Sequence, residues 1–142
     1  MRLINVYFAI LGIVTVACGL VDLLVTISTE PFAWGIVEFP GELFRGGWGG
    51  LVIIFAGLFY ISGARNVTDI HHLANILMGS VMIWMVAGCD IFARVTESIP
   101  GGEEGWFNTM EGFLGYYAPP YTSAIVLLPF SLVVIRYLCA KK

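Results

Sequence analysis

Charged side chains are scarce in this sequence, and their scarcity indicates the class of protein. Asp, Glu, Lys and Arg make up 12% of the 142 residues, whereas hydrophobic residues make up 58%. A soluble domain normally carries about twice that charged fraction. The few charges cluster between long apolar runs, which is typical of an integral membrane protein lying in a lipid bilayer. The net charge of −3 and the lack of a basic run argue against a nucleic-acid partner.

Cysteine and histidine are also rare. Cys18 and Cys89 lie within apolar runs and Cys139 lies at the end of the last one, so no cysteine stands in a loop where an oxidising compartment would pair it. The two histidines, His71 and His72, are adjacent, and adjacent side chains on a helix point about 100° apart. They therefore cannot bind one haem from both sides. We expect no cofactor and no metal, with these histidines as weak candidates for a metal or for a haem shared with another subunit.

Signatures of catalysis are missing as well. No nucleophile with a matching base, phosphate-binding loop or dinucleotide-binding turn can be recognised. The segment RGGWGG at 45–50 is rich in glycine, but it directly precedes an apolar run. Its glycines therefore favour a tight start to a helix over phosphate binding. The sequence favours a protein that is not an enzyme.

Four apolar runs are present, and they predict helices that cross the bilayer. We predict an all-α integral membrane protein, a bundle of four transmembrane helices in a single domain over residues 1–142. The second run is short unless the glycines at 46–50 are helical too. Pro129 predicts a kink in the fourth helix, because proline lacks the N–H donor. The predicted spans are residues 3–27, 48–62, 72–92 and 121–138.

Basic residues predict the orientation of the four spans. Arg2, Arg65, Lys141 and Lys142 lie at the two termini and in the short middle connection, whereas the two longer connections are rich in glutamate. By the positive-inside rule, both termini lie in the cytoplasm and both longer connections lie outside. We therefore expect a multi-pass protein of the cell membrane or of an inner membrane.

Aromatic residues are concentrated in the two longer connections. In the second connection they recur at helical spacing, which predicts a short amphipathic helix on the outer membrane surface. The first connection has a cruder version of the same pattern, which predicts a similar interfacial helix. Aromatic surfaces of this kind also suit the docking of a partner subunit. The candidate docking residues are Trp34, Trp106, Phe107, Phe113 and Tyr117.

Two carboxylates, Asp22 and Asp90, lie inside the first and third apolar runs and are the strongest functional candidates. A charge that faces lipid at a helix centre costs about 2.5 kcal/mol or more, so both side chains are expected to face the bundle interior. Each aspartate belongs to a stripe of small and polar residues along one side of its own predicted helix. We expect the stripes of the first and third helices to face each other. Arg94, four residues after Asp90, has the spacing for a helical ion pair. The remaining candidates are Thr15, Thr26 and Asn75 in the polar stripes, and Gly12, Gly19, Gly57 and Gly79 at close helix contacts.

The two carboxylates also point to an internal duplication. When Asp22 is aligned with Asp90, DLLVTIST meets DIFARVTE, and a proline and then a tryptophan follow in each half. Each half is then a helix, a longer outer connection and a second helix, a tandem 2+2 arrangement with both halves in the same orientation. The duplication predicts that Asp22 and Asp90 lie at matched depth near the outer surface.

Three functions are compatible with these patterns. The first is a small non-catalytic subunit of a larger membrane complex, in contact with lipid and with other membrane subunits or copies of itself. The alternative is a small oligomeric transporter or channel that uses Asp22 and Asp90 for a cation or a proton. A third is a redox or lipid-modifying enzyme that borrows a cofactor at His71 or His72. We place the complex subunit first and the transporter second.

Overall fold

The protein is mostly helical, and its long helices are apolar enough to lie in a membrane. A computed structural model describes residues 2–97 and 120–140, apart from the side chains of residues 94, 96 and 97. Four helical segments of the described chain are long and apolar enough to cross a bilayer, by length and composition. The prediction of a mostly helical chain with four helices apolar enough to cross a membrane is therefore confirmed. The segments are Arg2–Ser28, Leu43–Gly63, Ile70–Ala93 and Ser123–Ala140.

The second span begins earlier than its apolar run, because the glycine-rich segment is helical. It opens with a π-helix, η1 (Leu43–Trp48), and continues as α2 (Gly49–Gly63). The two together make a helical segment of 21 residues, which is long enough to cross the bilayer. The glycines at 46–50 are therefore helical, as a second span of sufficient length requires.

The fourth span is broken into α5 (Ser123–Ser131) and α6 (Val133–Ala140), with Leu132 between them. The predicted kink is present, and it falls just after Pro129. A break in lipid leaves backbone carbonyls that need donors. The hydroxyl of Tyr7 donates to the carbonyl of Phe130 at 2.9 Å, and Ser80 Oγ lies 3.5 Å from the carbonyl oxygen of Ser131. Side chains of the other helices therefore stabilise the broken backbone.

Helix α2 lies between the two helices that carry the aspartates. The first helix, α1 (Arg2–Ser28), packs against α2, and α2 packs against α3 (Ile70–Glu97), which in turn contacts α5. The expectation that the stripes of α1 and α3 face each other is therefore wrong, because each stripe packs on α2. Gly12 and Gly57 approach each other, as do Gly19 and Gly50. Gly79 of α3 lies against α2 from the other side, where a Cβ would come within 2.8 Å of the carbonyl oxygen of Ala56.

The first long connection forms a β-hairpin, so the interfacial helix expected there is wrong. Strand β1 (Phe32–Trp34) pairs antiparallel with β2 (Val37–Phe39). Gly35 has φ 63°, in the left-handed region that a two-residue hairpin turn requires. Pro31 and Pro40 flank the two strands and disfavour a continuous helix across this segment. The amphipathic helix predicted in the second connection lies outside the described residues.

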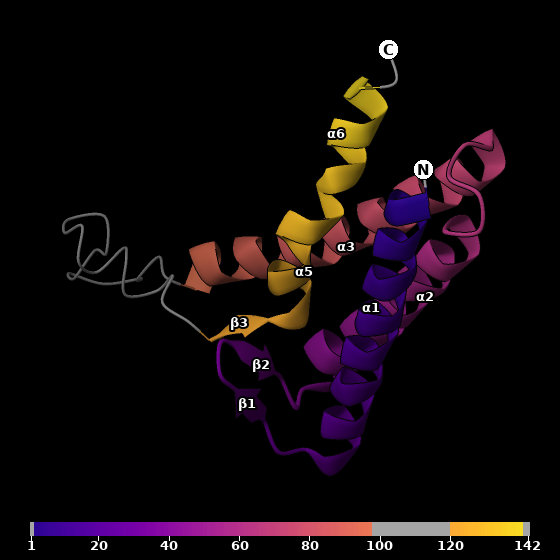
Figure 1. Cartoon of the computed structure of the whole chain (residues 1–142). Helices are drawn as coiled ribbons and strands as arrows, with labels where there is room; N and C mark the ends of the chain where they lie inside the picture. Colours follow the sequence, from indigo (N-terminus) through magenta and orange to yellow (C-terminus); the bar gives the residue numbers. More distant parts are fainter. Residues whose placement is uncertain (1, 98–119, 141–142) are drawn as a thin grey trace.

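A third strand links this hairpin to the fourth span. Strand β3 (Tyr121–Thr122) pairs parallel with β2 and leads directly into α5. The N–H of Tyr121 donates to the carbonyl of Ile36 at 2.8 Å. In Figure 1, α1 begins and α6 ends toward the top of the view, and the strands lie lower, between the far ends of α1 and α3. The sheet therefore fixes the start of α5 beside the helices that carry Asp22 and Asp90.

Candidate functional site

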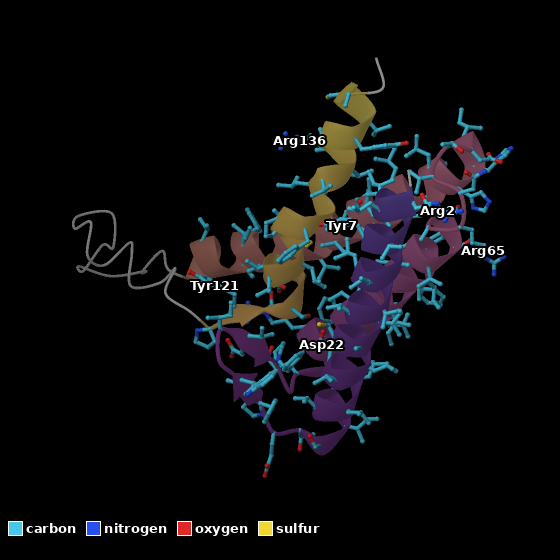
Figure 2. All side chains as sticks on the ribbon, viewed as in Figure 1. Arg2, Tyr7, Asp22, Arg65, Tyr121 and Arg136 are labelled. Carbon is cyan, nitrogen blue, oxygen red and sulfur yellow. The ribbon has the colours of Figure 1, made fainter. Side chains whose placement is uncertain are left out.

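Asp22 lies on the buried side of α1. Its exposed fraction is 3%, and Oδ2 accepts a hydrogen bond of 2.7 Å from Ser123 Oγ at the first residue of α5. Figure 2 places the Asp22 side chain on the side of α1 that faces the strands and the start of α5. The hairpin and β3 therefore bring a donor to Asp22 from a distant part of the chain.

Asp90 of α3 is almost as buried, with an exposed fraction of 9%. Its Oδ2 accepts a hydrogen bond of 2.8 Å from Thr122 Oγ1, and its Oδ1 lies 3.7 Å from Arg45 Nε in η1. The cation observed beside Asp90 thus comes from another helix, which the sequence reasoning did not anticipate. The side chain of Arg94, the predicted partner, lies outside the described part of the chain. Two adjacent residues, Thr122 and Ser123, each supply a hydroxyl to one aspartate.

The glycine-rich segment brings Arg45 to this position. A Cβ at Gly50 would lie 2.7 Å from the Cβ of Asp22, and a Cβ at Gly46 would clash with Thr26 Oγ1 and the carbonyl of Pro40. Only glycine lets η1 and the start of α2 approach α1 this closely. The segment therefore serves helix packing beside Asp22.

The two aspartates face one small cavity. Its free volume is about 10 Å³, roughly the room that one water molecule needs. Polar groups converge on it from four elements, α1, η1, α3 and the β3–α5 junction. An unhydrated small cation or a single water fits such a space. The polar residues that line it are Asp22, Arg45, Asp90, Thr122 and Ser123.

The other predicted polar residues bond elsewhere. Thr15 Oγ1 donates to the carbonyl of Leu11 at 2.7 Å, within its own helix. Thr26 Oγ1 donates to the backbone carbonyl of Asp22 at 2.8 Å, so Thr26 neighbours the site without contacting the carboxylate. Asn75 Nδ2 lies 3.3 Å from Ser62 Oγ, beside the turn between α2 and α3.

The two histidines lie at that same turn, away from the aspartates. The N–H of His71 donates to Asp69 Oδ1 at 2.9 Å, and the His71 side chain is exposed. Nδ1 of His72 lies 3.0 Å from the carbonyl oxygen of Ser62. In the described residues, no group of three or more His, Cys, Asp or Glu side chains comes together as a metal site would require.

The candidate docking residues can be followed only in part. Trp34 lies on β1 and is 78% exposed. The other four, Trp106, Phe107, Phe113 and Tyr117, lie outside the described residues. Of the aromatic surface expected from both connections, the described residues include only the hairpin of the first, where Trp34 is exposed.

A second buried polar group escaped the sequence reasoning. The hydroxyls of Tyr60 and Ser80 lie 2.7 Å apart, and Trp84 Nε1 donates to Ser131 Oγ at 2.7 Å. Tyr60, Ser80 and Ser131 are fully buried. A single serine in an apolar run forms no recurring pattern in the sequence, so this group could not be predicted, and only the fold brings its members together.

Comparison with known proteins found no match: no family model matches this chain, and neither a curated protein nor a solved structure resembles it significantly. The fold and the site geometry therefore carry the functional argument by themselves.

Proposed function

We propose that this protein carries protons or small cations across the membrane, with Asp22 as the binding group. The observation that supports this most directly is the isolation of Asp22. It is 3% exposed, Ser123 donates its hydrogen bond, and none of the described side chains places a cation within ion-pair distance of it. A buried carboxylate is very costly unless it is protonated or paired with a cation. Asp22 therefore calls for a proton or a cation that the described chain does not itself supply.

The surroundings of Asp22 favour binding of a single positive charge. Asp90 faces the same small cavity, and its carboxylate adds negative potential there. Arg45 lies beside Asp90, so that carboxylate already has a cation. The free volume admits about one water molecule or one small cation.

The depth of the site suits exchange with one side of the membrane. Asp22 lies six residues before the end of α1 at Ser28, about 9 Å at the helical rise of 1.5 Å per residue. Two further polar positions follow along α3, Ser80 and then His72, at intervals of about 15 Å or less. Among the described residues, no side-chain hydrogen bond connects the aspartates to Ser80 or Ser80 to His72. Transfer of a proton or cation between them therefore requires bound water or a movement of helices.

The decisive experiment measures proton flux into liposomes that contain the Asp22→Asn protein and enclose a pH-sensitive dye. Sodium and potassium flux is measured in parallel under gradients of those ions. Asparagine has the size of aspartate and can still accept the bond from Ser123, so we expect the fold to be preserved. We expect proton or cation flux to fall to that of protein-free liposomes. Asp69→Asn, which removes an exposed carboxylate at the start of α3, is the matched control and should retain full flux. Unchanged flux in folded Asp22→Asn protein would contradict the proposal.

A second candidate function is the non-catalytic subunit of a larger membrane complex. An open groove between α1 and α5, with a volume of about 420 Å³ and walls that are apolar apart from Tyr7 and Ser123, supports it. Such a surface suits a helix of another membrane subunit, since helices in lipid associate through close packing. Mass measurement of the intact assembly from native membranes separates the two functions. Stoichiometric unrelated subunits favour the complex, and a homo-oligomer favours the carrier.

A further inference from the structure

We propose that a second groove, between η1–α2 and α3, binds one membrane lipid with an anionic headgroup, and that Arg45 binds that headgroup. The groove has a volume of about 550 Å³, within the range of sites that hold small molecules. We call it the Arg45 groove. This inference goes beyond the proposed carrier function and does not depend on it. The apolar wall consists mainly of Phe44, Trp48, Val52, Met82, Met85 and Val86.

Arg45 gives the groove a charged end. Its side chain is 28% exposed, and its one ion-pair contact within residues 2–97 and 120–140 is Nε to Asp90 Oδ1 at 3.7 Å. That distance is too long for a hydrogen bond. Among the described residues, the guanidinium therefore has no hydrogen-bond acceptor. An arginine fork with free N–H groups matches the oxygens of a phosphate.

The rest of the groove suits an acyl chain. Its remaining walls are apolar apart from Asp90, and Trp48 and Met85 are 64% and 65% exposed, so the groove is open to the surrounding lipid. Methionine side chains adapt their shape to a flexible ligand. A lipid whose phosphate contacts Arg45 would lay its chain between η1–α2 and α3.

The position of Arg45 along its helix also fits a headgroup. Arg45 lies in η1, which opens the second span, and Trp48 follows within one turn. Tryptophan and arginine at the end of a span are typical of the membrane interface, where lipid phosphates lie. Asp90 also lines the groove, but its side chain is only 12% exposed, so Arg45 dominates the accessible charge. The accessible charge therefore favours an anionic over a zwitterionic lipid.

Fluorescence quenching of Trp48 tests this inference. The protein is placed in nanodiscs that contain a minor fraction of brominated phosphatidylglycerol or, in parallel, brominated phosphatidylcholine. The signal of Trp48 is the difference between the native protein and Trp48→Phe. We expect brominated phosphatidylglycerol to bind at Trp48 about fivefold or more tightly than phosphatidylcholine, as one interfacial arginine favours an anionic lipid.

Three variants make the result specific to the Arg45 groove. Arg45→Gln should abolish the preference. Gly49→Leu should abolish lipid binding, because its Cβ meets only Val86 at 3.7 Å and the longer side chain fills the groove without a backbone clash. Gly88→Leu, where a Cβ would meet nothing within 4 Å, is the matched control and should bind as the native protein does. Circular dichroism shows which variants are folded.

Two results would overturn the inference. The first is equal quenching of Trp48 by the two brominated lipids in the native protein. The second is a phosphatidylglycerol preference that persists in folded Gly49→Leu protein, which would mean that the lipid lies outside the groove. If Arg45→Gln does not fold, Gly49→Leu and Gly88→Leu still decide the question. Because none of these measurements involves ion flux, they can fail while the carrier proposal holds, and the reverse is also true.

Discussion

Gly57→Leu is expected to lower the free energy of unfolding by at least about 3 kcal/mol, the upper end of the usual cost of overpacking. An added Cβ at residue 57 would lie 2.6 Å from Val16 Cγ2 and 2.8 Å from the carbonyl oxygen of Gly12. Because one of these neighbours is backbone, rotation of a side chain cannot relieve the clash. Helices α1 and α2 would have to separate.

The same argument applies along the whole contact between α1 and α2. Gly12 lies opposite Gly57 and Gly19 lies opposite Gly50, so the two helices meet at two reciprocal glycine pairs. In lipid there is little hydrophobic drive between helices, and close backbone packing supplies much of their attraction. Separation of the pair would also displace Asp22, which lies against Gly50.

Unfolding in mixed micelles with increasing SDS, followed by circular dichroism, measures the effect. Gly88→Leu is the control, since a side chain there points into open space on α3. We expect Gly88→Leu to unfold at the native midpoint and Gly57→Leu at a much lower SDS fraction. A midpoint for Gly57→Leu equal to that of the control would refute the close packing of α1 on α2.

Tyr60→Ala is expected to cost about 3–5 kcal/mol, as truncation of a buried aromatic side chain usually does. Among the described residues, Tyr60 is the largest of the fully buried side chains. Its ring stacks on that of Phe8, with centroids 6.0 Å apart, and its hydroxyl lies 2.7 Å from Ser80 Oγ. The ring thus joins α1 to α2, and the hydroxyl joins α2 to α3.

Tyr60→Phe separates these two contributions. It keeps the ring and removes the hydroxyl, and we expect a loss of about 0.6–2 kcal/mol, the range for hydrogen bonds between membrane helices. Phe55→Ala on the same helix is the control, because Phe55 is 49% exposed. Equal midpoints for Tyr60→Ala and Phe55→Ala in the SDS titration would show that the ring has no special role in the core.

The features that could be predicted from the sequence are those with a local cause. Long apolar runs predict spans, and Pro129 predicts a kink in the fourth helix, which is interrupted three residues later, at Leu132. Burial of Asp22 follows from the cost of a charge in lipid. Each of these inferences needs only residues that are close together in the chain.

Of the predictions that failed, one depended on which helix packs against which, and the other on the turn within the first connection. The glycine stripe of α1 was expected to face α3, but glycines on α2 at positions 50 and 57 match its spacing and pack against it. In the first connection, aromatic spacing favoured a helix, but Gly35 and the flanking prolines favour a hairpin. The internal duplication remains a prediction, although Asp22 and Asp90 do face one cavity.

The sequence by itself determined that the chain has four helices apolar enough to cross a membrane, the approximate positions of these helices, and the presence of a carboxylate in the first and third of them. Hydropathy and the cost of burying charge are properties of single residues and short segments, so they can be read without a fold. Only the tertiary structure decided that Arg45, Thr122 and Ser123 meet those carboxylates. These contacts arise because glycine pairs draw α2 onto α1 and a short sheet anchors the start of α5, and both depend on residues far apart in the chain.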